Sequence, residues 1–430
     1  MKPNEGPQSL SRREFVGRAA AAGVAFAIPT IVPARALGRD GAVAPSQRIV
    51  LGAIGIGPRG HDVLNSMLGE ADVQFVAICD VRADRRRSVK AMADAKYGNQ
   101  DCKMYRDLRD VLARPDIDAF LIATGDRWHA LASMMAAKAG KDVYSEKPCA
   151  LTLGLCQDLD DTIRRYGRIF QAGTQRRSVP NFQAAVRLAR SGKLGRIHTL
   201  HASINELVTL YNWLPAEPEP ARDVVDWDLW LGPAPWRPFH HDYINGAWRG
   251  YFDFDAGGRL LDWGAHTVDL CQWANGSDDT APVEYEAGGG SVTARYSNGV
   301  KLVMRPGGWI PGLGTCPVRF EGDEGWVETG DTGLSEVYPK SLRAELESAR
   351  RMAGTDPANH ARNFFDCVKS GAKPACNSEV MRHSHIACHA AALAVQLGRK
   401  LRFDPAAERF IGDDEANRLR YRAMREPWHV

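Results

Sequence analysis

The fold is decided by residues 48–60, which read RIVLGAIGIGPRG. The apolar run at 48–54 predicts a buried strand, and it leads into Gly55, Gly57 and Gly60 in the order G-x-G-x-x-G. Only glycine lets the backbone turn so tightly and approach a pyrophosphate, whose charge is then stabilised by the N-terminus of the next helix. We therefore expect a dinucleotide site at this turn.

The rest of the chain shows two different patterns of apolar residues. Up to Gln171, short apolar runs alternate with helical patterns, which is typical of a parallel sheet covered on both faces. The strands expected there are residues 48–54, 73–79, 119–123, 142–145 and 169–172, and the helices are residues 60–68, 83–96, 131–139 and 155–166. Beyond Gln171, strands expected at residues 197–204, 292–296, 300–305 and 318–321 suggest a largely antiparallel sheet. The predicted fold class is an α/β Rossmann domain followed by an α+β domain with a largely antiparallel open sheet.

Length and composition limit the classes of protein to consider. A chain of 430 residues exceeds the size at which one hydrophobic core stops growing, so we expect two domains. Apolar residues make up 44% and charged residues 25%, as in ordinary soluble proteins, and a net charge of +3 does not favour nucleic acid as a partner. The nine cysteines include no C-x-x-C pair, so most are expected to be buried apolar residues rather than metal ligands or a disulfide framework.

The N-terminus has the features of a targeting segment. Residues 11–16 read SRREFV, a twin-arginine pattern, and an apolar, alanine-rich stretch follows at 19–28. Small residues at Ala34 and Ala36 fit the positions that a signal peptidase reads, which predicts cleavage after Ala36. We expect export to the periplasm, or elsewhere outside the cytosol, through the twin-arginine machinery, which carries folded proteins. A leader that contains the Arg-Arg pair by chance is the alternative.

The choice between NAD and NADP depends on the end of the second strand. Asp80 stands there, where a carboxylate bonds the ribose 2′-hydroxyl of NAD and repels the 2′-phosphate of NADP. Arg82 and Arg85 follow it, and either one would attract that phosphate if it faced the site. We therefore expect NAD, with NADP as the alternative.

Charged residues follow the strand at 142–145, at the edge where doubly wound folds bind their ligands. They are Glu146 and Lys147, and Pro148 stiffens the backbone beside them. A lysine at this place can reach both the nicotinamide face and a substrate hydroxyl. The tripeptide alone would also describe a surface ion pair beside a turn.

A second pair of reactive groups lies in a predicted helix after Gly257 and Gly258. Asp262 and His266 are four residues apart, which places both side chains on one helical face. A carboxylate and an imidazole that converge on one hydroxyl are suited to proton transfer. Without further context, a structural role is the commoner explanation for such a pair.

Taken together, these residues resemble the motifs of the Gfo/Idh/MocA oxidoreductase family. The family's glycine motif matches residues 55–60, its Glu-Lys-Pro motif residues 146–148, and its Asp-x-x-x-His motif residues 262–266. The stretches similar to the exported branch of the family, with a bacterial-type C-terminal domain, are residues 227–234, 248–254 and 425–428. Where relatives often have Thr-Pro, this chain has Thr124 and Gly125, so the loop over the nicotinamide ribose is expected to differ in detail.

The resemblance implies roles for single residues and for whole segments. Catalysis is assigned to Lys147, Asp262 and His266, with Asp262 orienting His266 and tuning its basicity. The expected cofactor-binding residues are Gly55, Ile56, Gly57, Arg59, Gly60, Asp80, Thr124, His129, Glu146, Lys147 and Gln175. The expected substrate-binding residues are Arg176, Arg177, Tyr243, Trp248, Tyr251 and Trp263. The expected segments are a signal peptide (1–36), a linker (37–47), a Rossmann domain (48–174), a substrate and oligomerisation domain (175–405) and a tail packing on the body (406–430).

Several of the substrate residues come from a long segment, residues 206–251, that is rich in Pro, Trp and Tyr. A long irregular loop inside a compact domain is usually functional. Aromatic faces stack on sugar rings, so Trp213, Tyr243, Trp248 and Tyr251 are candidates for a carbohydrate pocket. Core packing explains each of them equally well.

The histidines near the end of the chain do not predict a metal site. His385 and His389 share a helical face, but His383 does not lie well with both, and no carboxylate completes a ligand set. We therefore expect no bound metal.

The predicted function is that of an exported NAD(P)-dependent oxidoreductase acting on a secondary alcohol of a sugar, glycoside or polyol. No dependable pool of free NAD(H) exists outside the cytosol, so a tightly bound cofactor would be recycled in place. One alternative is a redox-neutral NAD-dependent glycosidase that oxidises, eliminates and reduces again. Another is a sugar-binding protein without activity on the same fold. The resemblance also implies a homo-oligomer formed through the C-terminal sheet.

Overall fold

The computed structural model of the protein describes residues 43–307, 309–347 and 358–428. The chain consists of two units, Met1–Arg48 and Ile49–Val430. The expected signal peptide lies outside the described residues, and the first unit contributes one described element, the short turn η2 (Pro45–Gln47). Within the described ranges, no helix is both long and apolar enough to cross a membrane.

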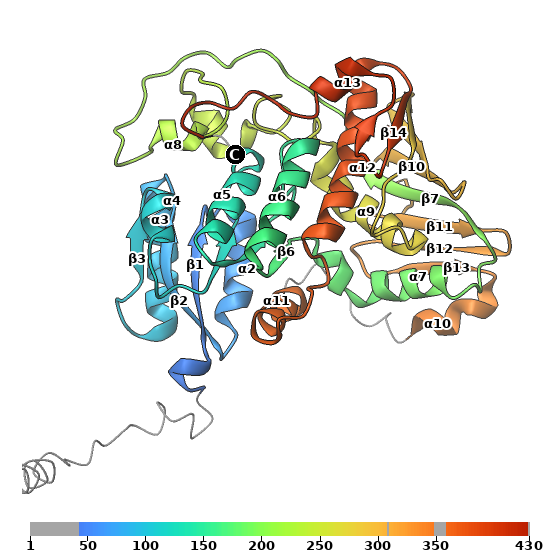
Figure 1. Ribbon diagram of the computed structural model, residues 1–430. Helices are drawn as coiled ribbons and strands as arrows, with labels where there is room; N and C mark the ends of the chain where they lie inside the picture. Colours follow the sequence, from blue (N-terminus) through green and yellow to red (C-terminus); the bar gives the residue numbers. More distant parts are fainter. Residues whose placement is uncertain (1–42, 308, 348–357, 429–430) are drawn as a thin grey trace, which may run out of the picture. The chain divides into compact units, whose positions relative to one another are not determined.

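The second unit begins with a six-stranded parallel sheet in the order β3-β2-β1-β4-β5-β6 (Figure 1). Its strands are β1 (Ile49–Ile54), β2 (Val73–Cys79), β3 (Lys103–Tyr105), β4 (Ala119–Ile122), β5 (Asp142–Ser145) and β6 (Phe170–Ala172). Central strands of such a sheet are buried on both faces, and every residue of β4 is indeed buried. The strand order reverses between β1 and β4, which confirms the predicted Rossmann fold and puts the ligand crevice at the carboxyl ends of these strands.

Five helices cover this sheet, α2 and α3 on one face and α4, α5 and α6 on the other. They are α2 (Pro58–Leu68), α3 (Ala83–Tyr97), α4 (Leu108–Leu112), α5 (Asp126–Lys138) and α6 (Leu153–Tyr166). Both ends of α6 follow from the sequence, because the Thr152 hydroxyl accepts a hydrogen bond from the Leu155 N–H and Gly167 ends the helix at φ 59°. β3 and α4 were not predicted, since β3 has only three residues and α4 only five.

A nine-stranded sheet follows, in the order β13-β12-β11-β7-β10-β9-β8-β14-β15. Its strands are β7 (Ile197–Ile204), β8 (Glu284–Gly288), β9 (Ser291–Arg295), β10 (Lys301–Pro306), β11 (Val318–Gly322), β12 (Gly325–Thr329), β13 (Ser335–Tyr338), β14 (Leu401–Asp404) and β15 (Arg409–Phe410). The neighbouring strands run antiparallel except for β7 and β10, so the prediction of a largely antiparallel sheet is confirmed. The helices packed against it are α7 (Pro180–Arg190), α9 (Leu260–Asn275) and α12 (Ser378–Leu397), and the short elements after β13 are η5 (Lys340–Arg343) and α10 (Ala344–Glu347). β8 and β12 to β15 were not predicted.

One helix from the second half of the chain returns to the Rossmann sheet. The apolar face of α11 (Ala358–Ser370) enters the same buried cluster as α2 and β1. Arg362 on this helix forms ion pairs with Glu70 (2.8 Å) and Asp72 (2.7 Å). The segment expected to form a separate domain, 175–405, therefore contributes part of the Rossmann core.

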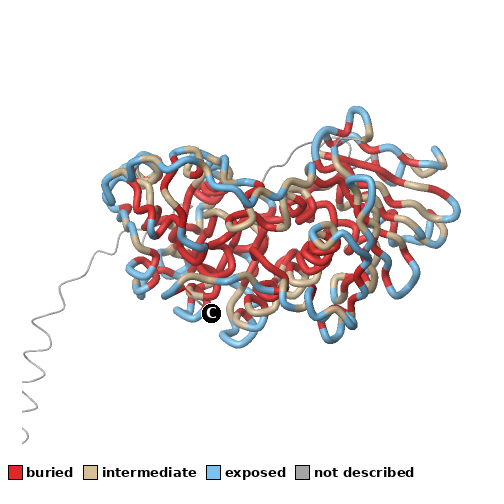
Figure 2. Tube along the Cα trace, turned by 90° about the horizontal axis from the view of Figure 1, so that it is seen from above, coloured by how far each residue is buried: buried red, intermediate tan, exposed pale blue. Residues whose placement is uncertain are grey.

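Buried segments of both sheets and of their covering helices form the interior, and exposed loops surround it (Figure 2). The nine cysteines all belong to the described residues, and each is buried and free, as predicted from their spacing. His385 and His389 are also buried, and their Nε2 atoms lie 3.2 Å from the Cys149 nitrogen and the Ala150 oxygen, respectively. These two histidines are packed residues.

The segment between β7 and α9 lies at the carboxyl end of the Rossmann sheet. It contains α8 (Trp227–Leu231) and a helical turn, η4 (Tyr243–Ala247). A β-bridge between Arg82 and Val225 joins it to the end of β2. Its aromatic cluster consists of Trp227, Trp230, Phe239, Tyr243, Tyr251 and Phe254. These packed rings make the segment a wall of the crevice rather than a loose loop.

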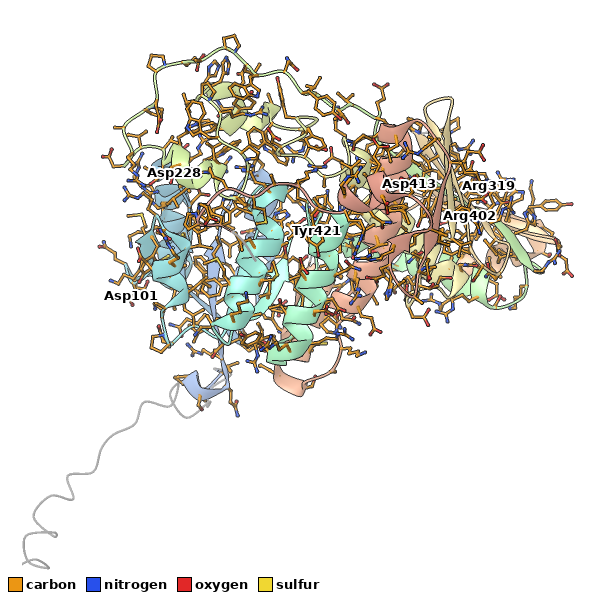
Figure 3. The ribbon with its side chains drawn as sticks, turned by 45° about the horizontal axis from the view of Figure 1, so that its top comes forward. Asp101, Asp228, Arg319, Arg402, Asp413 and Tyr421 are labelled. Carbon is orange, nitrogen blue, oxygen red and sulfur yellow. The ribbon has the colours of Figure 1, made fainter. Side chains whose placement is uncertain are left out.

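The end of the chain crosses the Rossmann helices. After α13 (Asp414–Arg418), Tyr421 lies against α6, and its hydroxyl donates a hydrogen bond to Asp158 at 3.2 Å (Figure 3). Arg425 forms an ion pair with Asp228 of α8, which Figure 3 also labels. The end of the chain thus connects α6 with the segment that walls the crevice.

Candidate active site

A cavity of about 810 Å3 lies at the carboxyl ends of β1, β2, β4 and β5. It extends from the glycine turn after β1 to the charged residues after β5, and it is also lined by η4, Trp248 and Arg249. The predicted site residues that line it are Gly55, Ile56, Gly57, Arg59, Gly60, Asp80, Thr124, His129, Glu146, Lys147 and Trp248. Groups from four different strand ends therefore meet in one cavity.

Three glycines shape the turn between β1 and α2. Gly55 has φ 69°, and a Cβ atom there would lie 2.3 Å from the methyl carbon of Thr124. A Cβ atom at Gly60 would lie 2.7 Å from a side chain just after β4, so this glycine lets α2 approach the sheet. At Gly57 an added Cβ would have only the Arg85 guanidinium within 4 Å. The backbone is therefore bare where a pyrophosphate would approach the helix N-terminus, and the turn fits a dinucleotide.

Asp80 ties the end of β2 to the glycine turn. Its Oδ2 accepts a hydrogen bond from the Ile56 N–H and its Oδ1 one from the Arg82 N–H, both at 2.9 Å. Burial raises the pKa of this carboxyl group, while the charge of Arg85 acts in the opposite direction. A carboxylate oxygen accepts more than one hydrogen bond, so both oxygens can still bind ribose hydroxyls. Asp80 thus lies at the cavity in the position that the sequence predicts.

The two arginines after Asp80 differ in their surroundings. Arg82 pairs with Asp84 at 2.6 Å and donates to the Ile244 carbonyl at 2.8 Å, so its guanidinium is engaged by the cavity wall. Arg85 lines the cavity near Gly57, and within the described ranges its guanidinium forms no ion pair. Arg85 is therefore the arginine that could meet a cofactor phosphate.

Lys147 connects the Rossmann domain with the start of α9. Its Nζ donates a hydrogen bond to the backbone oxygen of Asp262 at 2.8 Å, across 115 positions of sequence. The Asp262 carboxylate lies 3.3 Å from the Asn205 amide nitrogen and within 4 Å of the Arg249 and Arg259 guanidinium groups. Two of the predicted catalytic residues therefore meet at the end of the cavity.

His266 is buried on α9 and contacts Arg176 of the turn η3 (Gln175–Ser178). Nη1 of Arg176 lies 2.7 Å from Nε2 of His266. A guanidinium has no acceptor, so Nε2 accepts the hydrogen bond and the ring proton resides on Nδ1. Burial, and then the charges of Arg176 and Lys147, lower the pKa of His266 well below its usual value. The imidazole is therefore neutral at pH 7, and its buried Nδ1 has no hydrogen-bond partner among the described residues.

The residue that orients His266 is not the predicted one. Asp262 and His266 lie on one helix, but the Asp262 carboxylate contacts Asn205 and two arginines, and the prediction that it orients the imidazole is wrong. Arg176 takes that place, and Asp331 holds Arg176 with two hydrogen bonds of 3.0 and 2.7 Å. One helical turn separates Asp262 from His266, so Asp262 contacts Asn205 after β7 whereas His266 contacts Arg176 of η3.

Among the predicted site residues, Asp262, His266, Gln175, Arg176 and Arg177 do not line the cavity. Gln175 donates to the Glu146 carboxylate at 2.7 Å and so positions a cavity residue. Arg177 is buried and forms ion pairs with Asp269 (2.6 Å) and Asp278 (2.7 Å). Its charge is neutralised inside the protein, so the prediction that Arg177 binds substrate is wrong.

Most of the predicted aromatic substrate residues also lie elsewhere. Tyr243 and Tyr251 are buried in the aromatic cluster, where the Tyr243 hydroxyl accepts a hydrogen bond from Arg237 at 3.1 Å. Trp263 is half-buried and Trp213 is exposed, and neither lines the cavity. Core packing accounts for the two tyrosines, so the prediction that they bind substrate is wrong.

Charged residues that were not predicted as site residues lie at the start of α5, which begins earlier than the predicted residue 131. Asp126 lines the cavity, and burial together with the charge of Asp255 raises its pKa. The Arg127 guanidinium lies 3.5 Å from the ring centroid of Trp230, and burial lowers its pKa to about 9. The signal in the sequence was the pair Thr124 and Gly125 directly before these residues, where relatives often have Thr-Pro.

Comparisons with known proteins agree with this geometry. The family model described as "Oxidoreductase family, NAD-binding Rossmann fold" matches residues 49–174, and the model of the "Oxidoreductase family, C-terminal alpha/beta domain" matches residues 201–430. The chain therefore belongs to the Gfo/Idh/MocA oxidoreductase family, as its motifs predict. Its first domain is the NAD-binding domain of that family.

The relatives are distant. The uncharacterized oxidoreductase YrbE of Bacillus subtilis is 24% identical over 72% of this chain and 74% of its own length. Myo-inositol 2-dehydrogenase of Thermotoga maritima is 30% identical over 35% of this chain and 43% of its own length. The solved structure of the WlbA dehydrogenase from Bordetella pertussis, in complex with NADH and UDP-GlcNAcA, has a TM-score of 0.63 at 18% identity. That similarity covers 83% of this chain and 98% of the other, and it shows a shared fold.

Proposed function

We propose that the protein is an exported, NAD-dependent oxidoreductase that acts on a secondary alcohol of a sugar, glycoside or polyol. The observation that carries the proposal is that one cavity is lined both by the glycine turn and by Lys147, whose Nζ donates a hydrogen bond to the backbone oxygen of Asp262 on α9. The partial match to a myo-inositol 2-dehydrogenase supports a sugar or polyol alcohol as the substrate class.

The cofactor end of the cavity fits NAD better than NADP. Gly57 leaves the turn open to a pyrophosphate, and Asp80 is available to the ribose hydroxyls and repels a 2′-phosphate. When bound there, the nicotinamide ring accepts or supplies the hydride. Arg85, which lines this end and forms no ion pair among the described residues, favours NADP.

Lys147 is the group best placed to act at the reacting oxygen: the ammonium form donates the proton in the reduction, and the amine form accepts it in the oxidation. It lines the cavity, and its ammonium group is held by a backbone oxygen, which fixes the position of Nζ without neutralising its charge. A cation at this point stabilises the negative charge that develops on the oxygen as its proton leaves. Asp262 supports Lys147 by presenting that backbone oxygen.

His266 is the second proton-transfer group in the proposal. Its lowered pKa keeps the ring neutral, so Nε2 can accept a proton once a substrate hydroxyl replaces Arg176 there. While the Arg176 contact persists, Nε2 is occupied and the buried Nδ1–H has no hydrogen-bond partner among the described residues. Arg176 therefore controls whether Nε2 of His266 is free to serve the reaction.

Trp248 and Arg249 are the residues we assign to the sugar ring. Both line the cavity, and the Arg249 guanidinium lies 4.5 Å from the centroid of the Trp248 ring. An aromatic face packs on the apolar face of a sugar, and a charged group bonds its hydroxyls. A homo-oligomer formed through the nine-stranded sheet belongs to the same proposal.

The decisive experiment is to purify the protein without added nucleotide, denature it, and analyse what it releases. We expect about one NAD or NADH per chain, identified by mass and ultraviolet absorption, because an exported enzyme must keep its cofactor. Incubation with inositols, aldoses and glycosides then separates net oxidation from redox-neutral cleavage by the products formed. Protein that releases no nucleotide and binds none on titration would contradict the proposal.

Export is tested separately in the full-length chain. Arg12→Lys with Arg13→Lys should retain the precursor in the cytosol, because twin-arginine recognition depends on the guanidinium pair rather than on charge alone. Cell fractionation and immunoblotting measure the distribution. Unchanged export of the double variant would mean that another pathway reads the leader.

A further inference from the structure

We propose that Glu217, His240 and His241 form a binding site for a divalent transition-metal ion such as Zn2+. The three residues lie in the segment between β7 and α9, and none of them lines the active-site cavity. One ligand atom from each lies within 4.8 Å of the others. The proposal is independent of the reaction assigned to the cavity.

The distances between the ligand atoms suit a small ion. Oε1 of Glu217 lies 2.8 Å from Nδ1 of His241 and 3.4 Å from Nε2 of His240. Donor atoms around a tetrahedral Zn2+ stand roughly 3.3 Å apart, as bond lengths of about 2.0 Å require. The side chains of Glu217 and His241 are 31% and 57% exposed, so they can rotate to admit the ion.

Backbone hydrogen bonds hold the ligand residues close to one another. The Glu217 N–H donates to the carbonyl of Phe239 at 2.9 Å, and the His241 N–H donates to the Glu217 carboxylate at 2.8 Å. The rings of His240 and His241 stack with their centroids 4.7 Å apart, and the His240 ring packs edge to face on Tyr243 of the aromatic cluster. Ligands that are already positioned lose little conformational freedom when an ion binds.

Asp242 supplies the outer partner that metal-bound imidazoles usually have. Its carboxylate oxygens lie 2.9 Å from Nε2 of His241 and 3.7 Å from Nδ1 of His240. When a metal takes one ring nitrogen, the proton resides on the other, and a carboxylate accepts it. At His240 this means that Nδ1, which accepts the Asp242 N–H at 3.1 Å, exchanges that contact for the carboxylate.

The types of ligand atom determine which class of metal ion the site would prefer. Two imidazoles and one carboxylate suit Zn2+, Ni2+ or Cu2+, whereas Ca2+ and Mg2+ prefer oxygen ligands. The site directly precedes η4, whose Ile244 and Asn245 line the active-site cavity, so a bound ion would fix that wall. The expectation of no metal rested on the histidines at 383, 385 and 389, and Glu217 is 24 positions away from His241, so their spacing gives no motif in the sequence.

The test uses the full chain without a histidine tag, treated with a chelator and then equilibrated with micromolar Zn2+. Metal content per chain is measured by mass spectrometry, and the melting temperature with and without Zn2+ by circular dichroism. The test variants are Glu217→Gln and the double change His240→Ala with His241→Ala. The matched control is His198→Ala, which removes an exposed histidine from β7.

We expect the wild type and His198→Ala to bind one more Zn2+ per chain than the double variant. Their melting temperatures should be higher with Zn2+ than without it, whereas that of the double variant should not change. Glu217→Gln should weaken binding about tenfold or more, as loss of a charged ligand does. The visible spectrum of added Co2+ should report the same difference. Equal zinc content in the wild type and a folded double variant would overturn the proposal, and so would a wild type that binds no Zn2+.

Discussion

The two ends of the active-site cavity are built in different ways. At the cofactor end, Asp80 bonds the glycine turn across only 24 positions of sequence. At the other end, Lys147 meets Asp262 across 115 positions, and Arg176 meets His266 across 90 positions behind the residues that line the cavity. The first end is a local product of one β-α-β unit, β1, α2 and β2, whereas the second forms only when the two halves of the chain pack together. Changes at the first should therefore alter cofactor binding, and changes at the second should alter chemistry.

The strongest test of this division is Lys147→Ala. Turnover should fall about a thousandfold or more, because the variant loses both a proton-transfer group and a charge that stabilises the developing oxyanion. The dissociation constant for NAD should change only slightly, since the lysine contacts α9. Steady-state kinetics and nucleotide titration measure the two effects.

Lys138→Ala, which removes an exposed lysine on α5, is the control and should behave as the wild type. If Lys147→Ala kept activity within about tenfold, or about 1.4 kcal/mol of barrier, its role in the reaction would be refuted.

His266→Ala should have the next largest effect. We expect kcat to fall about a hundredfold, the usual scale for a general acid or base, with a much smaller change in KM. His198→Ala controls for the loss of an imidazole. A large rise in KM with an unchanged kcat would show that His266 binds the sugar and that Lys147 alone transfers the proton.

Asp80→Ala tests the cofactor end. The variant should bind NAD about tenfold more weakly, because it loses a hydrogen bond to the ribose, and NADP should be affected less, because a repulsion disappears as well. Asp101→Ala, which removes an exposed carboxylate between α3 and β3 and away from the cavity, is the control. Equal losses for both cofactors would show that Asp80 supports the turn through Ile56 without facing the ribose.

The same contrast explains what the sequence could predict. The glycine turn, Asp80 and Lys147 could be placed because each follows a strand whose apolar run is visible, and parallel strands end at one edge. The partner of His266 could not, since helical spacing shows which residues share a face but not which element faces them. Tyr243 was misassigned for a related reason, because an aromatic ring has the same sequence signal in a core as in a sugar pocket.

The remaining prediction concerns the contact that the sequence did not reveal. The charge of Arg176 is the largest cause, after burial, of the lowered pKa of His266. A lowered pKa keeps the imidazole in its basic form down to acidic pH, so activity that needs the neutral ring is lost only when the pH falls through that low pKa. Removal of the charge raises the pKa, and the loss then begins at a higher pH.

Arg176→Gln should therefore shift the acid limb of the kcat/KM profile to higher pH, whereas Arg176→Lys, which keeps a cation, should leave it near that of the wild type. Direct NMR titration of the His266 ring in both variants separates a change in its pKa from a change in substrate affinity. An acid limb that does not move in Arg176→Gln would mean that His266 is not the group whose protonation limits the reaction. A limb that moves equally in both variants would instead assign the shift to the lost geometry of the guanidinium, which Asp331 holds with two hydrogen bonds.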